Sequence, residues 1–146
     1  MYTINDIKDH GSEERLLSAL AIEARRAAYT PYSGFRVGAA LLAESGKIYL
    51  GCNIENAAYS PTNCAERTAF FKAVSEGERR FSAIAIAGGA SELPNDICPP
   101  CGVCRQVMRE FCHDDFTLIL GKSDTEFDVC TLKDLLPLSF SPKDVK

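Results

Sequence analysis

The sequence lacks any run of apolar residues long enough to cross a membrane as a helix, which takes roughly 18 or more. Its first residues have neither the basic start nor the apolar stretch of a secretory signal peptide. It also contains no internal repeat and no linker. These absences predict a cytoplasmic protein without a membrane partner. The 146 residues are enough for one domain, residues 1–146, with one sizeable core.

An excess of basic charge is also missing. The formal net charge is −4 and the sequence pI is about 5.2. Phosphate contacts supply most of the non-specific affinity for nucleic acids, so a protein that binds them usually has a basic face. The short pairs Arg25-Arg26 and Arg79-Arg80 are typical of solvated surfaces. We therefore expect no nucleic-acid partner.

The cysteines do not predict a disulfide framework. There are seven of them, an odd number, and no secretory signal accompanies them. In a reducing compartment, clustered cysteines indicate metal binding or catalysis, whereas isolated ones usually act as small buried apolar side chains. The clustered cysteines are therefore the candidates for chemistry.

Helices and strands alternate along the sequence. Ser12 is the predicted N-cap of a first helix, which Pro31 stops near Thr30. Further helices are predicted from Cys64 to about residue 77, from about Cys101 to residue 111, and from 132 to 136. The predicted strands are 35–43 and 47–53, which form a hairpin, and 81–87, 116–120 and 127–130. This alternation predicts an α/β layered domain with a central sheet.

Two short segments carry the residues for a metal site. Cys101 and Cys104 have the CxxC spacing of a zinc half-site, and Cys64 lies at another predicted helix start. A helix N-terminus favours the thiolate form that binds metal. Three ligands leave one position open for water, as in a catalytic zinc site, where the pKa of that water falls towards ~7. Glu66 is placed to take its proton without binding the metal.

The charge of the predicted zinc site suggests a role for Arg67. Three thiolates leave the zinc site with a net charge of −1, which weakens the metal as a Lewis acid. Arg67 follows Glu66 directly, and a hydrogen bond from it to a thiolate would offset that charge.

The cysteine spacing leaves a second interpretation open. Cys98, Cys101 and Cys104 form a CxxCxxC run. With Cys64 or Cys112 as the fourth ligand, that run would make a closed zinc site or an iron–sulfur cluster in a non-catalytic module. The residues alone favour the open catalytic site, because Pro99-Pro100 is expected to turn Cys98 away.

Together these residues resemble the zinc-dependent nucleoside deaminases, whose signature is [HC]-x-E followed by P-C-x-x-C. The likeness is greatest to the short, homotetrameric cytidine deaminases, and it extends from about Tyr29 to Phe140. Five segments carry it: 31–33 (Pro-Tyr-Ser), 35–40 (Phe-Arg-Val-Gly-Ala-Ala), 51–59 (Gly-Cys-Asn-Ile-Glu-Asn-Ala-Ala-Tyr), 64–67 (Cys-Ala-Glu-Arg) and 100–106 (Pro-Cys-Gly-Val-Cys-Arg-Gln).

The resemblance implies a three-layer α/β/α fold with a five-stranded mixed sheet. It implies hydrolytic deamination of cytidine and deoxycytidine by a zinc-bound hydroxide, in pyrimidine salvage. One Zn²⁺ per subunit would be held by Cys64, Cys101 and Cys104, with Glu66 as the acid/base. The partners would be a pyrimidine nucleoside, water and three further copies of the chain.

The resemblance also implies a substrate site. Phe35 matches a residue that lines the pyrimidine pocket, and Ala65 matches one whose backbone contacts the base. Asn53 and Glu55 match the pair that binds the ribose hydroxyls, although on residues alone the simpler explanation is that they close a turn, because Asn is a common turn former. Phe140 matches an aromatic that reaches a neighbouring subunit's pocket and packs on the base, although taken by itself it is more simply a packed residue of the tail.

Two further positions bear on the expected subunit contacts. Tyr32 and Tyr59 match positions near the subunit interface, with ordinary packing as the default interpretation. Leu138-Ser139 stands before Phe140, where members of the family often have a small pair such as Gly-Ala.

Other substrates remain as alternatives. A related zinc deaminase would act on a nucleotide, a blasticidin-type aminonucleoside or a base in RNA. The Asn53-x-Glu55 pair argues against the first two, and the acidic pI argues against RNA.

Overall fold

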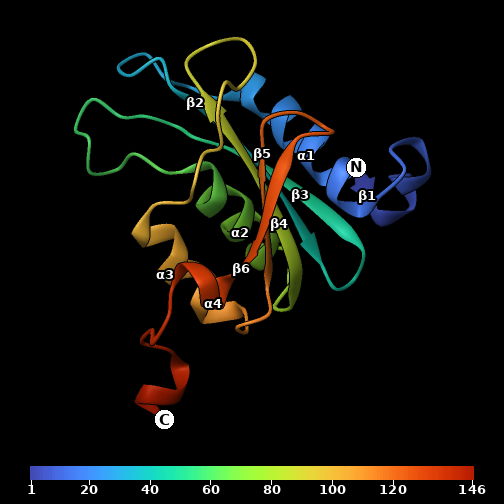
Figure 1. The fold of residues 1–146 in the computed structure, drawn as a ribbon. Helices are drawn as coiled ribbons and strands as arrows, with labels where there is room; N and C mark the ends of the chain where they lie inside the picture. Colours follow the sequence, from blue (N-terminus) through green and yellow to red (C-terminus); the bar gives the residue numbers. More distant parts are fainter.

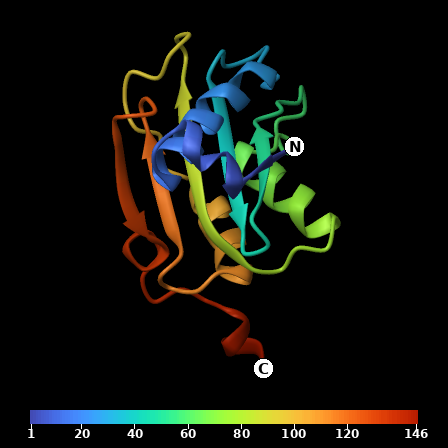
Figure 2. The ribbon, with the colours of Figure 1, turned by 90° about the vertical axis from the view of Figure 1, so that its right-hand side faces the viewer.

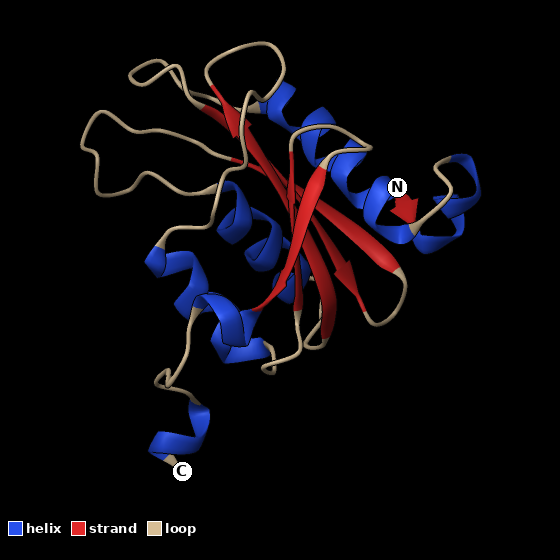
Figure 3. Ribbon diagram, viewed as in Figure 1, coloured by secondary structure: helices blue, strands red, loops and turns tan.

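One mixed β-sheet forms the middle of the molecule, with helices on both of its faces (Figures 1 and 3). The computed structural model describes the backbone of residues 1–146 and the side chain of every residue except Asp9. Strands β4 and β5 pair in parallel, and every other pair in the sheet is antiparallel. The predicted three-layer α/β/α architecture is confirmed.

The sheet has six strands in the order β1-β3-β2-β4-β5-β6. Their bounds are β1 Tyr2–Thr3, β2 Arg36–Ala43, β3 Lys47–Cys52, β4 Phe81–Gly89, β5 Thr117–Gly121 and β6 Phe127–Thr131. Strands β2 to β6 are the five that the sequence predicts. The additional strand β1 pairs Tyr2 with Ile48, and two residues are too few to show the alternation on which strand prediction rests.

The helices begin where the sequence places their caps. They are α1 Glu13–Ala24, α2 Ala65–Ser75, α3 Gly102–Phe111 and α4 Leu132–Leu135, with 3-10 turns at Ile4–Asp9, Arg25–Ala27 and Pro142–Val145. The hydroxyl of Ser12 accepts from the backbone N–H of Arg15, and that of Thr131 accepts from Asp134. Helix α1 ends at Ala24 and the 3-10 turn at Ala27, so the helical segment stops before Thr30. Within the described residues, every helix is too short or too polar to cross a bilayer.

Alternate residues of the central strands enter two different cores. Ala39 and Leu41 of β2 face α2 and α3, whereas Ala40 and Leu42 face α1 (Figure 2). Both faces of the sheet are therefore covered, which is why these strands read as continuous apolar runs. Burial on both sides holds the ends of β2, β3 and β4 in place, and the loops that leave those ends carry the candidate site residues.

Glycine is required where the sheet meets the helices. A Cβ on Gly38 would lie 2.0 Å from the carbonyl oxygen of Ala21, and one on Gly51 would lie 2.3 Å from that of Ala65. Helices α1 and α2 thus rest directly on the backbone of β2 and β3. The contact at Gly51 places the first turn of α2, and Cys64 just before it, against the sheet.

The sequence predicts that Arg25 and Arg26 both lie on a solvated surface, and the structure agrees for only one of them. Arg26 is exposed and pairs with Glu23, as expected. Arg25 is only 3% exposed, and the expectation is wrong for it. Its guanidinium donates to the carbonyl oxygens of four residues, Arg36, Gly89, Ser91 and Glu92. Arg25 thereby fastens the loop that follows β4 to the start of β2.

The close packing at Gly38 yields the first prediction. Replacing Gly38 with Ala forces α1 away from β2 and should lower the free energy of unfolding by about 3 kcal/mol, as overpacking does in well-filled cores. Denaturant unfolding followed by circular dichroism measures this loss. Gly89→Ala is the matched control, because a Cβ there meets nothing closer than 3.5 Å. Equal stability of the two variants would contradict the packing argument.

Candidate metal centre and active site

Two helix N-termini meet at the candidate metal site. Cys64 is the N-cap of α2 and Cys101 is the N-cap of α3, and the side chain of neither residue caps its own helix. The unpaired N–H groups at a helix start carry partial positive charge, which stabilises a thiolate beside them. The chain thus brings two favourable sites for anionic sulfur together from segments 37 residues apart.

The three predicted ligands form one cluster. The Sγ atoms of Cys64 and Cys101 are 3.8 Å apart, those of Cys101 and Cys104 are 3.5 Å apart, and all three lie within 4.8 Å of one another. Tetrahedral zinc with Zn–S bonds of ~2.3 Å holds its sulfurs about 3.8 Å apart. The donor set and its spacing therefore suit Zn²⁺. Three cysteine ligands leave one of four tetrahedral positions open.

The other two cysteines considered as ligands lie outside this cluster. A Cβ on Gly88 would lie 2.8 Å from the Sγ of Cys98, so that thiol packs against the end of β4. Burial raises the pKa of Cys98 to about 11 and that of Cys112 to about 12. Neither Sγ atom belongs to the group of three that lie within 4.8 Å of one another. This arrangement favours the open site over a closed one with four cysteines.

Glu66 stands beside the cluster as a buried carboxyl group. It is the second residue of α2 and is 4% exposed. Burial, together with the negative charge of Cys64, raises the pKa of Glu66 to about 7. A carboxyl group with a pKa near neutrality can both take up and release a proton at physiological pH. A buried carboxyl group that can exchange a proton near neutral pH therefore lies beside the cysteine cluster.

The predicted contact between Arg67 and a ligand is present. Nη2 of Arg67 donates to the Sγ of Cys64 over 3.2 Å. Hydrogen bonds from the thiol of Cys104 and from Arg67 lower the pKa of Cys64 to about 5. The first ligand is therefore ionised in the neutral pH range.

Asn53 and Glu55 hold the loop that precedes β2. The side chain of Asn53 accepts from the N–H of Val37 and donates to the carbonyl oxygen of Phe35, over 2.8 and 2.9 Å. The Glu55 carboxylate accepts the N–H groups of Tyr32 and Ser33 and the Ser33 hydroxyl, which lowers its pKa. These are the contacts of the turn-closing interpretation. Each side chain keeps hydrogen-bonding capacity beyond them.

The remaining predicted residues lie at different places. Ala65 is fully buried at the first position of α2, and Phe35 is 42% exposed just before β2. Phe140 is 62% exposed in the C-terminal segment, which extends away from the body of the molecule (Figures 1 and 2). Tyr32 and Tyr59 pack edge to face, with 6.2 Å between ring centroids, and both are exposed.

Sequence reasoning missed two arginines, Arg25 and Arg105, that hold the connection from β4 to α3, which leads to Cys101 and Cys104. Arg25 fastens the loop after β4, as described above. Arg105 donates through Nε to the carbonyl oxygen of Pro100, directly before Cys101. A signal for Arg25 exists, because it continues the buried stripe of Leu17 and Ala21 at four-residue spacing.

Comparison with known proteins places this site in a family. Residues 12–120 match the model of the cytidine and deoxycytidylate deaminase zinc-binding region, so all three cysteines of the cluster lie inside the matched segment. A cytidine deaminase from Sporosarcina psychrophila is 54% identical over 129 residues, which cover 88% of this chain and 92% of that protein. One from Halalkalibacterium halodurans is 47% identical over 133 residues, which cover 91% and 98%.

A solved structure gives the same result for the fold. The crystal structure of cytidine deaminase from Burkholderia pseudomallei superposes with a TM-score of 0.80 at 43% sequence identity, covering 88% of this chain and all of that one. Sequence and fold thus agree over most of the chain, and zinc is the metal that the cysteine cluster binds. The chain belongs to the cytidine and deoxycytidylate deaminase family.

Proposed function

We propose that residues 1–146 form a single catalytic domain that hydrolyses cytidine and deoxycytidine to uridine and deoxyuridine, with release of ammonia, in pyrimidine salvage. The observation that carries this proposal is the three-cysteine cluster with one open position beside the buried carboxyl group of Glu66. The similar proteins from Sporosarcina psychrophila and Halalkalibacterium halodurans are cytidine deaminases, which supports the choice of substrate.

The proposed roles divide between the metal site and Glu66. Zinc held by Cys64, Cys101 and Cys104 lowers the pKa of water and so supplies a nucleophile at neutral pH. Glu66 takes one proton from the attacking water and gives it to N3 of the base as oxygen bonds to C4. It then carries the second proton of that oxygen to the 4-amino group, which leaves as ammonia. The near-neutral pKa of Glu66 suits both transfers.

The proposed substrate contacts come from segments on both sides of the metal site. Phe35 lines the pyrimidine pocket, and the backbone of Ala65 contacts the base. Asn53 and Glu55 hydrogen-bond the ribose hydroxyls with the donor and acceptor capacity left after their contacts with the 31–37 loop. The negative charge of Glu55 disfavours a 5′-phosphate, which makes nucleosides better substrates than nucleotides.

We further propose a cytoplasmic homotetramer with shared active sites. Several large aromatic side chains are exposed on the single chain, among them Tyr29, Tyr32, Tyr59 and Phe140. Two of them, Tyr32 and Tyr59, pack edge to face at the surface, and exposed apolar side chains that gather in this way are typical of an interaction surface. In the tetramer, Phe140 of one subunit packs on the base bound by its neighbour. The seven free cysteines suit a reducing compartment.

The reaction is tested by following the loss of cytosine absorbance when the purified zinc protein is mixed with cytidine. Wild-type protein should turn over, and Glu66→Gln should lose at least about 1,000-fold in kcat while it retains zinc, because the proton carrier is gone. Glu110→Gln, an exposed change on α3, is the control and should match the wild type. A zinc-loaded, folded wild type that leaves cytidine unchanged would refute the proposed substrate.

The role of Arg67 is tested by metal retention. Arg67→Gln removes the cationic donor to Cys64 and should weaken zinc binding about 10- to 100-fold, as loss of such contacts does in other zinc sites. Competition with a chromogenic zinc chelator measures the change, with the exposed Arg79→Gln as the control. If both variants hold zinc as the wild type does and show unchanged kinetics, Arg67 has no such role.

Shared active sites are tested by complementation. Glu66→Gln and Phe140→Ala each lie in a different part of a shared site, so both homo-oligomers should be weak enzymes. Mixed oligomers, made by co-expression with two affinity tags, should recover part of the wild-type activity, because some sites combine an intact Glu66 with an intact neighbouring Phe140. Mixed oligomers no more active than the average of the two parents would refute sharing.

A further inference from the structure

The C-terminal segment 137–146 touches the body of the protein at few points. Its residues are all exposed or half-buried, and its terminal 3-10 turn, Pro142–Val145, has no buried residue. Leu138 is wholly exposed and has a left-handed backbone, with φ 50°. Among the described residues, a single hydrogen bond joins this segment to the rest of the chain. Nε2 of Gln106 donates to the backbone oxygen of Phe140 over 2.9 Å.

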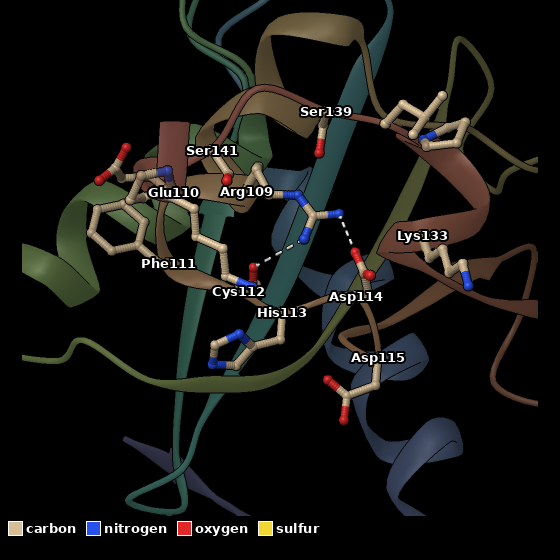
Figure 4. Close-up of a pocket in the computed structure, with 14 residues that line it drawn as sticks. Arg109, Glu110, Phe111, Cys112, His113, Asp114, Asp115, Lys133, Ser139 and Ser141 are labelled. Atoms are coloured by element: carbon tan, nitrogen blue, oxygen red, sulfur yellow. Dashed lines mark hydrogen bonds and ion pairs between the residues drawn. The ribbon is translucent and has the colours of Figure 1, made fainter. Parts of the chain in front are cut away.

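The C-terminal end of α3 makes no hydrogen bond to the segment 137–146 among the described residues. A cavity of about 740 Å³ lies between that end and the segment that carries Ser139 and Ser141 (Figure 4). The guanidinium of Arg109 points instead to the Asp114 carboxylate, at 2.8 Å, and to the carbonyl oxygen of Cys112, at 3.5 Å. The attachment of Phe140 therefore depends on the first two turns of α3.

Those same turns carry the metal ligands Cys101 and Cys104. Arg105, between Cys104 and Gln106, donates through Nε to the oxygen of Pro100 and through Nη1 to the oxygen of Leu135, each over 2.8 Å. Two consecutive side chains of α3 thus bind the backbone on both sides of the turn at residues 136–139. The helix that holds the metal also determines where the C-terminal segment lies.

We propose that Gln106 is a positioning residue that holds Phe140 in place for substrate binding, with Arg105 anchoring the preceding end of α4. The proposal rests on the proposed function, in which Phe140 packs on the base. A bond to the backbone oxygen of Phe140 restricts the position of its Cα, from which the ring must reach the base. Without that bond, Phe140 occupies the binding position for a smaller fraction of the time, and apparent affinity falls by that fraction. The chemistry at the metal is unaffected.

The experiment replaces Gln106 with Met, which is neutral and of similar length but has no N–H donor. The control is Glu110→Met, which places the same new side chain one turn further along α3, at an exposed residue. Gln106→Met should raise KM for cytidine about fivefold, within the range expected for one neutral hydrogen bond, and should change kcat less than about twofold. Zinc content should not change. Amide hydrogen exchange in residues 138–146 should become faster in this variant and not in the control.

A double variant separates positioning of Phe140 from a general structural role. Phe140→Ala should raise KM as well, and Gln106→Met combined with Phe140→Ala should be no worse than Phe140→Ala alone, because Gln106 acts through the ring that is gone. Penalties in KM that multiply in the double variant would overturn the proposal. Unchanged KM and unchanged exchange in Gln106→Met would also overturn it. A wild type that holds zinc but leaves cytidine intact refutes the proposed function itself, which the wild-type assay reports separately.

Discussion

Three cysteine sulfurs within 4.8 Å of one another are the constraint on which the rest of this structure depends. Ionised thiolates at that spacing repel each other, so the site requires compensating positive charge. Zinc supplies most of it, two helix N-termini supply partial charge, and Arg67 adds a hydrogen bond to Cys64. The same negative environment, with burial, keeps the pKa of Glu66 near neutrality. Metal binding and the near-neutral pKa of Glu66 thus have one electrostatic origin.

The sheet brings the N-termini of α2 and α3 together at the cysteine cluster. Helix α2 follows β3 and helix α3 follows β4, so both helices start at the same end of a buried sheet. Close packing at Gly51 places the start of α2, and the bonds of Arg25 and Arg105 to backbone oxygens hold the connection from β4 to α3. A misplaced helix start would separate the ligands by several ångströms. Backbone packing far from any substrate therefore decides the geometry at the metal.

Asn53 and Glu55 link the conformation of the loop that carries Phe35 to substrate recognition. Asn53 and Glu55 hold the loop that carries Phe35, and in the proposed function they also bind the sugar. A side chain already held by two or three hydrogen bonds loses little freedom when the substrate arrives, which favours binding. The turn-closing and the ribose-binding interpretations of these residues are therefore compatible, because pre-organisation by the first serves the second.

Spacing and caps in the sequence alone determined the helix starts at Cys64 and Cys101, the five main strands and the CxxC pair of Cys101 and Cys104, because these features depend on neighbours in the chain. Contacts between distant segments were decided only by the tertiary structure. The two-residue strand β1 exists because β3 has an open edge, and Arg25 is buried because four carbonyl oxygens from other segments surround it. Likewise, the hydrogen bond from Gln106 to Phe140 joins residues 34 positions apart, and no local sequence pattern predicts such a pairing.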